Sequence, residues 1–164
     1  YLASFYNKKF NTAASSHQLI EKDIIKLLNS PLSVILLNRF NASLKSTSIE
    51  KFNNKIPTNK VDNLQGIRSI CHVTSQPDWG NIYLHSPTHS MDSTKLIKFL
   101  KSYRNRGDFH EACIESIFVT VLEDFVVNDL TVYGKFLRRG GIDINPIRST
   151  SKKLLFNNFR DFNQ

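Results

Sequence analysis

The stretch QGIRSICHVTSQPDWGNIYLH, Gln65–His85, contains two runs typical of β-strands. The first run covers Gln65–Thr74 and the second covers Asn81–His85, and both are rich in β-branched, aliphatic or aromatic residues. The residues Gln-Pro-Asp-Trp-Gly between them include Pro, Asp and Gly, which favour turns. We therefore predict a β-hairpin. Cys71 and Asp78 would both lie near its corner, where they could have a chemical role.

The rest of this half of the chain supplies helices and a second pair of strands. Apolar residues recur at helical spacing between the two pairs of strands: Ile114, Ile117, Phe118, Val121, Leu122 and Phe125. The runs DLTVYGKFL and GIDINPI follow, joined by Arg138, Arg139 and Gly140. The order strand, strand, helix, helix, strand, strand predicts an α+β domain, in which two helices pack on one face of an antiparallel sheet.

The beginning of the chain resembles part of this module. YLASFYN at Tyr1–Asn7 matches FLKSYRN at Phe99–Asn105, and LSV at Leu32–Val34 matches LTV at Leu130–Val132 at the same offset. Between each pair of matches lies a helical pattern. We predict that residues 1–63 are the remnant of a first module followed by a polar connector, and that residues 64–164 are a complete second module.

Composition limits the classes of protein that this chain can belong to. It has 164 residues, a net charge of +8 and two cysteines, and it has no apolar run of about 18 residues that would span a membrane. Two cysteines are too few for a disulfide framework, and no Cys/His cluster has zinc spacing. The basic charge is compatible with an anionic partner such as nucleic acid, a phosphorylated cofactor or an acidic surface, but the scattered basic residues favour an ordinary solvated basic surface.

Two motifs occur only in the second module. If folding required them, both modules would be expected to carry them, so their restriction to one module favours a functional site. The first is DFHEA at Asp108–Ala112, where Asp108 and Glu111 could form a capping box, or His110 and Glu111 could bind a flat heterocycle such as a purine or pterin. The second is RRGG at Arg138–Gly141, which reads as a hairpin turn and also as a site for phosphate groups. Cys71 could likewise be a small buried apolar residue, and Asp78 a turn former.

Three motifs together resemble a known family: CHVTSQPDWG, LIKFLKSYRNRGDFHEAC and VYGKFLRRGGIDINPIRS. They are similar to the NADPH-dependent 7-cyano-7-deazaguanine reductases of queuosine biosynthesis, which are nitrile reductases of the tunnelling fold. The similarity is to the form with two modules. In that family a Glu-Ser-Lys-Ser segment would precede Tyr1, so the sequence is expected to be an N-terminally truncated member with impaired turnover.

The resemblance implies roles for six residues. Cys71 would add to the substrate nitrile to give a covalent thioimide, and Asp78 would be the proton donor. His110 and Glu111 would hold the deazaguanine, while Arg139 and Gly140 would contact NADPH. Two NADPH would reduce the nitrile to the primary amine 7-aminomethyl-7-deazaguanine, and no metal would take part.

These implied roles make chemical sense. A nitrile accepts hydride poorly until a thiolate has added to it, so Cys71 needs a lowered pKa. Asp78 has to hold its proton near neutral pH, which burial beside Trp79 could achieve. The resemblance also implies a cytoplasmic homo-oligomer, a dimer, with a small-molecule substrate and without a nucleic-acid or membrane partner. Two alternatives remain: a pterin-type cyclohydrolase, which would need a zinc site, and a non-catalytic basic binding module.

Overall fold

The structure is a computed structural model that describes residues 2–5, 7–35, 44–152, 159–161 and 164. Contacts divide the chain into two compact units, Tyr1–Phe40 and Asn41–Gln164. The predicted boundary between modules, at residues 63 and 64, lies inside the second of these units and stays a prediction. Each unit is described by itself.

The first unit contains a short 3-10 helix, η1 (Leu2–Phe5), and one α-helix, α1 (Ala13–Leu28). A capping box starts α1, because the Thr12 side chain accepts from the Ser15 amide and the Ser15 side chain accepts from the Thr12 amide. Asn29 ends the helix in the left-handed conformation at φ 49°. Leu32–Val34, which the sequence match compares with a strand, has no regular structure, because no described segment of this unit pairs with its backbone.

A five-stranded sheet forms the centre of the second unit, in the order β1-β3-β4-β6-β7. Its strands are β1 (Thr47–Ser48), β3 (Val61–Ile70), β4 (Pro77–His85), β6 (Thr131–Phe136) and β7 (Ile147–Ser149). All neighbours are antiparallel except β1, which runs parallel to β3. A separate pair joins β2 (Lys55–Ile56) to β5 (Met91–Asp92). The predicted hairpin of β3 and β4 is therefore confirmed, but its turn lies at residues 71–76, because Pro77 to Gly80 pair with β3 as part of β4 and do not form the expected corner.

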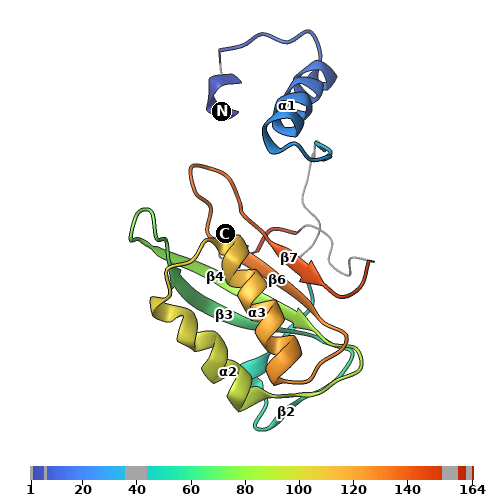
Figure 1. Ribbon diagram of the computed structural model, residues 1–164, viewed down its shortest axis with the longest axis vertical. Coiled ribbons are helices and arrows are strands. Elements are labelled where there is room, and N and C mark those ends of the chain that lie inside the picture. Colours follow the sequence, from blue (N-terminus) through green and yellow to red (C-terminus); the bar gives the residue numbers. More distant parts are fainter. Residues whose placement is uncertain (1, 6, 36–43, 153–158, 162–163) are drawn as a thin grey trace. The chain divides into compact units, whose positions relative to one another are not determined.

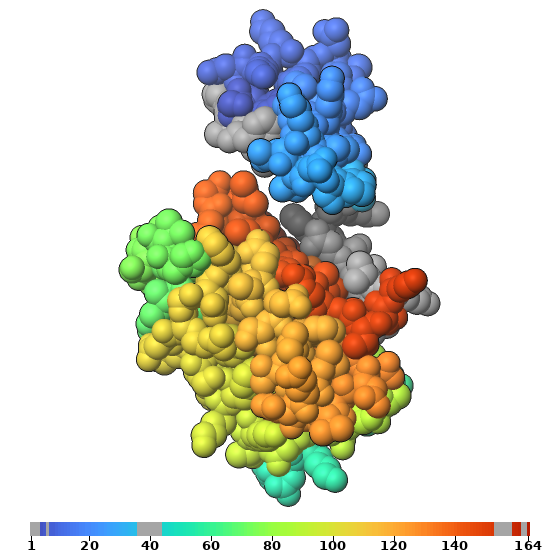
Figure 2. All heavy atoms as spheres, viewed as in Figure 1, coloured from blue at the N-terminus to red at the C-terminus, as the bar shows by residue number. Residues whose placement is uncertain are grey.

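Two helices cover one face of this sheet (Figure 1). They are α2 (Ser93–Lys101), which continues into the 3-10 helix η3 (Ser102–Asn105), and α3 (His110–Asp124). In Figure 2 their side chains, yellow and orange, form a continuous surface over this face. The core lies between helices and strands and includes Leu96, Ile114, Ile117, Val121, Ile82, Leu84 and Val132. This arrangement confirms the predicted α+β class.

The polar segment ahead of β3 also contributes to this core. Ile49, at the start of the 3-10 helix η2 (Ile49–Lys51), and Ile56 in β2 are almost fully buried. Asp92 ends β5 and caps α2, because its side chain accepts from the Lys95 amide at 2.7 Å. The segment from Thr47 to Ile56 is thus packed as part of the second unit, although its composition had indicated a connector.

The other face of the sheet carries a polar cluster beside the buried rings of Tyr83, Tyr133 and Phe159, and residues near the C-terminus cover it. Asp161 accepts hydrogen bonds from Asn81 Nδ2 at 2.8 Å and from the Tyr83 hydroxyl at 2.6 Å. Lys135 is almost fully buried, donates to the Phe159 carbonyl and lies over the Phe159 ring. Both faces of the central strands are therefore buried, one by helices and one by this polar cluster.

The connection from β6 to β7 differs from the predicted hairpin. The expected second strand, GIDINPI, is a loop up to Pro146, and pairing with β6 resumes at Ile147. Gly140 and Gly141 have φ values of 57° and 81°, and a single bridge joins Arg139 to Ile142. Two successive left-handed residues turn the backbone away from the extended course of a strand, so the tight turn is present but the long strand is not.

Candidate functional site

The turn that follows β3 presents Cys71. The Cys71 amide donates to the Gln76 carbonyl at 2.9 Å, and the Ser75 amide donates to the Cys71 carbonyl at 2.7 Å. Ser75 adopts a left-handed conformation at φ 56°, which closes the turn. These bonds fix the backbone on both sides of the thiol and bring it back toward the start of β4, where Asp78 lies.

The two cysteines have opposite electrostatic environments. The Thr74 side chain and the backbone of Thr74 and Val73 hydrogen-bond to the Cys71 thiol, and they lower its pKa below the ordinary value of 9.0. Burial in the helical core raises the pKa of Cys113 to about 12. Cys71 therefore has the character of a nucleophile, whereas Cys113 has that of a packing residue.

Asp78 is buried, but Trp79 does not shield it. Successive strand residues point to opposite faces, and the Trp79 side chain is 37% exposed on the other side of β4. The expectation of burial beside Trp79 is therefore wrong. The partners of the Asp78 carboxylate are Arg139 and His110 instead.

Arg139 directs its guanidinium at the corner between β3 and β4. Its Nε donates to Asp78 Oδ1 at 2.9 Å, and its Nη2 donates to the same oxygen. Its Nη1 donates to Gln76 Oε1 at 2.7 Å, and its Nη2 also reaches the Pro77 carbonyl at 3.4 Å. A residue that sequence reasoning assigned to the cofactor is thus in direct contact with the candidate proton donor.

His110 and Glu111 open helix α3 beside Asp78. The His110 ring is 6% exposed, stacks on Phe136 at 4.2 Å, and places Nε2 3.3 Å from Asp78 Oδ2 without hydrogen-bond geometry. Glu111 is exposed. The expected capping box does not form, because the helix begins after Phe109 and the Asp108 carboxylate lies 3.3 Å from Arg106 Nε.

These side chains line one pocket of about 450 Å³. The complete lining is Cys71, Val73, Thr74, Asp78, Phe109, His110, Glu111, Arg139 and Ile144. It includes five of the six predicted site residues, while Gly140 is not among them. The volume lies in the range of pockets that hold small molecules, which is about 300–1,000 Å³.

Sequence reasoning missed Phe109 and Thr74. Phe109 is 53% exposed, and its ring meets that of His72 edge-on at 4.0 Å. An apolar residue directly before the polar pair His110 and Glu111 was a signal that could have indicated a stacking surface. Thr74 could be recognised only from the conformation of the turn, because two residues separate it from Cys71 in the sequence.

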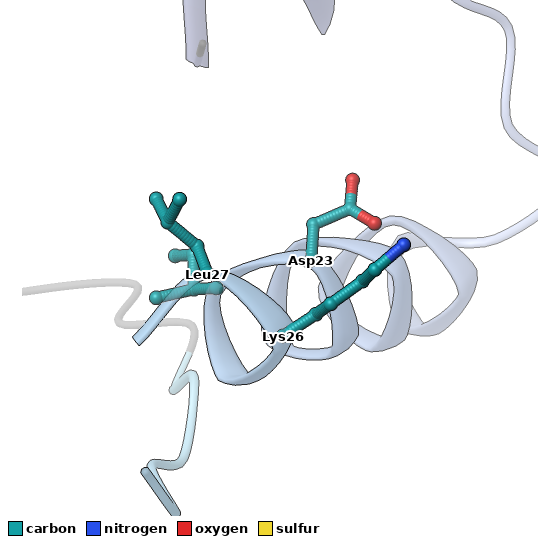
Figure 3. A pocket seen from close by; sticks show the side chains of 4 residues that line it. Asp23, Lys26 and Leu27 are labelled. Atoms are coloured by element: carbon teal, nitrogen blue, oxygen red, sulfur yellow. The ribbon is translucent and has the colours of Figure 1, made fainter. Parts of the chain in front are cut away.

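A hollow of similar size occurs on the first unit, along α1. Asp23, Ile24, Lys26 and Leu27 line it, and Figure 3 shows three of these side chains projecting from the helix. All four belong to one helical surface and converge on no common point. This hollow therefore has the features of an amphipathic helix face rather than those of a chemical site.

No three His, Cys, Asp or Glu side chains in the described part of the chain lie close enough together to hold a metal ion. None of its helices has the length and apolar character needed to cross a membrane.

The fold and the site define an α+β protein in which an activated cysteine and a buried carboxylate share a ligand-sized pocket. A family model described as "QueF-like protein" matches residues 77–154. A protein from Coxiella burnetii (strain RSA 493 / Nine Mile phase I) is 35% identical over all of this chain and 66% of its own length. It is named NADPH-dependent 7-cyano-7-deazaguanine reductase.

Two further relatives with the same name differ in their sequence identity to this chain and in the length of the matching segment. The protein from Colwellia psychrerythraea is 29% identical over 92% of this chain and 62% of its own length. The protein from Legionella pneumophila (strain Corby) is 48% identical over 51% of this chain and 30% of its own length. A solved archaeosine synthase QueF-Like covers 60% of this chain with a TM-score of 0.49 and 15% identity.

The match of residues 77–154 to the QueF-like family model and the full-length similarity to named 7-cyano-7-deazaguanine reductases confirm the resemblance seen in the motifs of this chain. It spans 66% of the length of the Coxiella relatives that it matches, which is slightly less than two thirds.

Proposed function

We propose that this chain reduces the nitrile 7-cyano-7-deazaguanine to the primary amine 7-aminomethyl-7-deazaguanine, with NADPH as the reductant. The observation that carries this proposal is the convergence of Cys71 and Asp78 on one pocket, where the thiol of Cys71 has a lowered pKa. The relatives named above support the choice of substrate and cofactor. A nitrile reductase needs a nucleophile and a proton donor at the same carbon–nitrogen bond.

The first chemical step joins the substrate to the protein. The Cys71 thiolate forms a bond from Sγ to the nitrile carbon, and one π bond of the nitrile breaks toward nitrogen. That nitrogen takes a proton from Asp78, which gives a thioimide with a C=N bond. Asp78 lines the same pocket as Cys71, which supports a direct transfer of the proton to the nitrogen of the bound nitrile.

The reduction of the thioimide requires two hydride equivalents in succession, which bound NADPH supplies. The residues of this chain hold the reacting carbon in place and keep water away from the imine between the two steps. Phe109 offers an exposed ring on which the flat heterocycle can stack, and Glu111 offers a carboxylate to its N–H groups. His110 reaches the same pocket with an Nε2 that has no hydrogen-bond partner among the described residues.

The residues around Arg139 fit a phosphorylated cofactor. A guanidinium is the preferred donor to phosphate, and the Arg139 side chain is 35% exposed. Gly140 follows it with a positive φ and no heavy atom within 4 Å of its missing side chain, so a ligand can approach the backbone closely. Arg138 adds positive charge nearby but is paired with Asp143 at 3.2 Å.

The remaining predictions belong to the same proposal. We propose a tunnelling-fold module at residues 64–164, preceded by the remnant of a related module, and a homo-oligomer in the cytoplasm. The two free cysteines suit a reducing compartment. The substrate is the free base, so the chain would not bind nucleic acid directly.

The proposal is tested by incubating the purified chain with the nitrile and NADPH and measuring both NADPH absorbance and the amine by mass spectrometry. We expect two NADPH oxidised for each amine formed. Cys71→Ala should abolish product, whereas Cys113→Ala, which changes a cysteine outside the pocket lining, should retain it. Equal product from the wild-type chain and Cys71→Ala would refute the proposal.

A further inference from the structure

The guanidinium of Arg139 is fully engaged by the corner between β3 and β4. Its Nε and Nη2 donate to Asp78 Oδ1, its Nη1 donates to the Gln76 side chain, and Nη2 also faces the Pro77 carbonyl. All three nitrogens therefore point at one short segment. Asp78 occupies the edge formed by Nε and Nη2, so a phosphate that binds this edge in a bidentate manner has to compete with Asp78.

Arg139 is nevertheless in a position from which it can move. Its side chain is about one third exposed, whereas the side chain of Asp78 is 5% exposed. The loop that carries Arg139 is held near its tip by one bridge to Ile142, and the positions that β-carbons would take at Gly140 and Gly141 have open space around them. The arginine is thus the exposed partner of the pair, with room to change its direction, and the carboxylate is the buried one.

We propose that Arg139 is shared between Asp78 and the cofactor. It pairs with Asp78 when no cofactor is bound, and a cofactor phosphate has to take it from that carboxylate. This inference rests on the proposed function, because it takes NADPH as the anion that competes. It gives Arg139 a second role, as a positioning residue for the proton donor.

The exchange has a consequence for proton transfer. Proton delivery to the nitrile nitrogen needs an Asp78 oxygen that faces the substrate, whereas Nε and Nη2 of Arg139 both donate to Oδ1. His110 from α3 lies 3.3 Å from the other oxygen, Oδ2. When Arg139 leaves, no Arg or Lys among the described residues remains paired with Asp78, and Oδ1 can face the substrate. Cofactor binding would thus expose the proton donor to the nitrile.

The test measures binding of NADP⁺, the non-reducing form of the cofactor, by calorimetry. We compare wild type, Asp78→Asn, Arg139→Gln and the double variant, with Arg138→Gln as the matched control. If Arg139 is free in about one molecule in ten, removing its competitor should tighten NADP⁺ binding by up to roughly tenfold in Asp78→Asn. Arg139→Gln should weaken binding by about tenfold or more. In the Arg139→Gln background, Asp78→Asn should have no further effect.

An NADP⁺ affinity that is unchanged or weaker in Asp78→Asn would overturn the sharing of Arg139 while leaving the cofactor assignment intact. Tightening that persists in the double variant would also overturn it, because the effect would then be general electrostatics. If wild type does not bind NADP⁺ at all, both the cofactor assignment and the sharing are wrong.

A second readout measures proton delivery rather than cofactor binding. The rate of adduct formation between Cys71 and the nitrile is measured by intact mass with and without NADP⁺. We expect NADP⁺ to raise this rate in wild type, because it removes Arg139 from Asp78, and to have no such effect in Arg139→Gln. The same rate with and without NADP⁺ in wild type would contradict the proposal.

Discussion

Asp78 Oδ2 lies 3.3 Å from His110 Nε2, and both side chains are almost completely buried. The other oxygen of the same carboxylate accepts from Arg139. Asp78 therefore lies between His110 at the start of a helix and Arg139 in a loop, two residues that are 29 positions apart in sequence. This geometry makes Asp78 the centre of the site, and several predictions depend on it.

Asp78→Asn should separate proton donation to the nitrile from the reactivity of the Cys71 thiol. We expect adduct formation with the nitrile to slow by about 10²- to 10⁴-fold, because the proton donor is lost. Alkylation of Cys71 by iodoacetamide should not slow, because the negative charge of Asp78 acts to raise the pKa of that thiol. Parallel loss of adduct formation and alkylation would indicate a misfolded pocket instead.

Cys71 should be alkylated much faster than Cys113 in the folded protein. The hydrogen bonds from Thr74 and Val73 lower the pKa of the Cys71 thiol, while burial raises that of Cys113 to about 12. Peptide mapping after limiting iodoacetamide at pH 7 measures both rates. In urea the difference should disappear, and equal labelling without urea would contradict the assignment.

Thr74→Val removes the hydroxyl that contributes most to the lowered pKa of Cys71 and keeps the shape of the side chain. We expect the midpoint of the pH dependence of Cys71 alkylation to rise. Thr74→Ser retains the hydroxyl and is the matched control, so it should restore the wild-type midpoint. A Thr74→Val midpoint equal to wild type would mean that the backbone of the turn alone activates the thiol.

The sequence predicted the parts of this molecule that depend on local pattern. Period-two and helical spacing located β3, β4, β6 and α3, and the positions of Cys71, Asp78, His110 and Arg139 followed from motifs. The contact of Arg139 with Asp78 could not be predicted, because the two residues are 61 positions apart in sequence. The loop after β6, which no local pattern describes, brings them together. The strand expected at GIDINPI failed for a related reason, since two left-handed glycines override the β-propensity of the isoleucines.

Close packing of α3 on the sheet depends on Gly134. A β-carbon there would lie 2.7 Å from Ile114 Cδ1 and 2.8 Å from Phe136 Cε2, both in the core. Gly134→Ala should lower the free energy of unfolding by about 1–3 kcal/mol, as overpacked cores do. Gly107→Ala is the control, because its β-carbon would meet no atom closer than 3.6 Å, and it should change that free energy by no more than about 1 kcal/mol. Urea denaturation compares the two, and equal destabilisation would contradict the packing argument.

Asp62 should make stability fall as pH rises between about 4 and 6. Burial raises the pKa of this carboxyl from 3.8 to about 6. The folded state therefore binds the proton more tightly than the unfolded state, and the resulting stabilisation is complete below pH 4 and lost as pH passes 6. Asp62→Asn should remove this pH dependence. The free energy of unfolding of the variant, relative to that of wild type, should therefore rise by on the order of 2 kcal/mol between pH 4 and pH 6. A constant difference between the two proteins from pH 4 to 7 would contradict it.

The most direct test of the whole account is the intact mass of the chain after incubation with 7-cyano-7-deazaguanine in the absence of NADPH. We predict a mass increase equal to one nitrile molecule, since addition of the thiol to a nitrile expels no atom. Peptide mapping should place that increase on the peptide that contains Cys71, and the increase should be absent from Cys71→Ala. No adduct on the folded chain, or an adduct on Cys113, would contradict the assignment of Cys71 as the nucleophile.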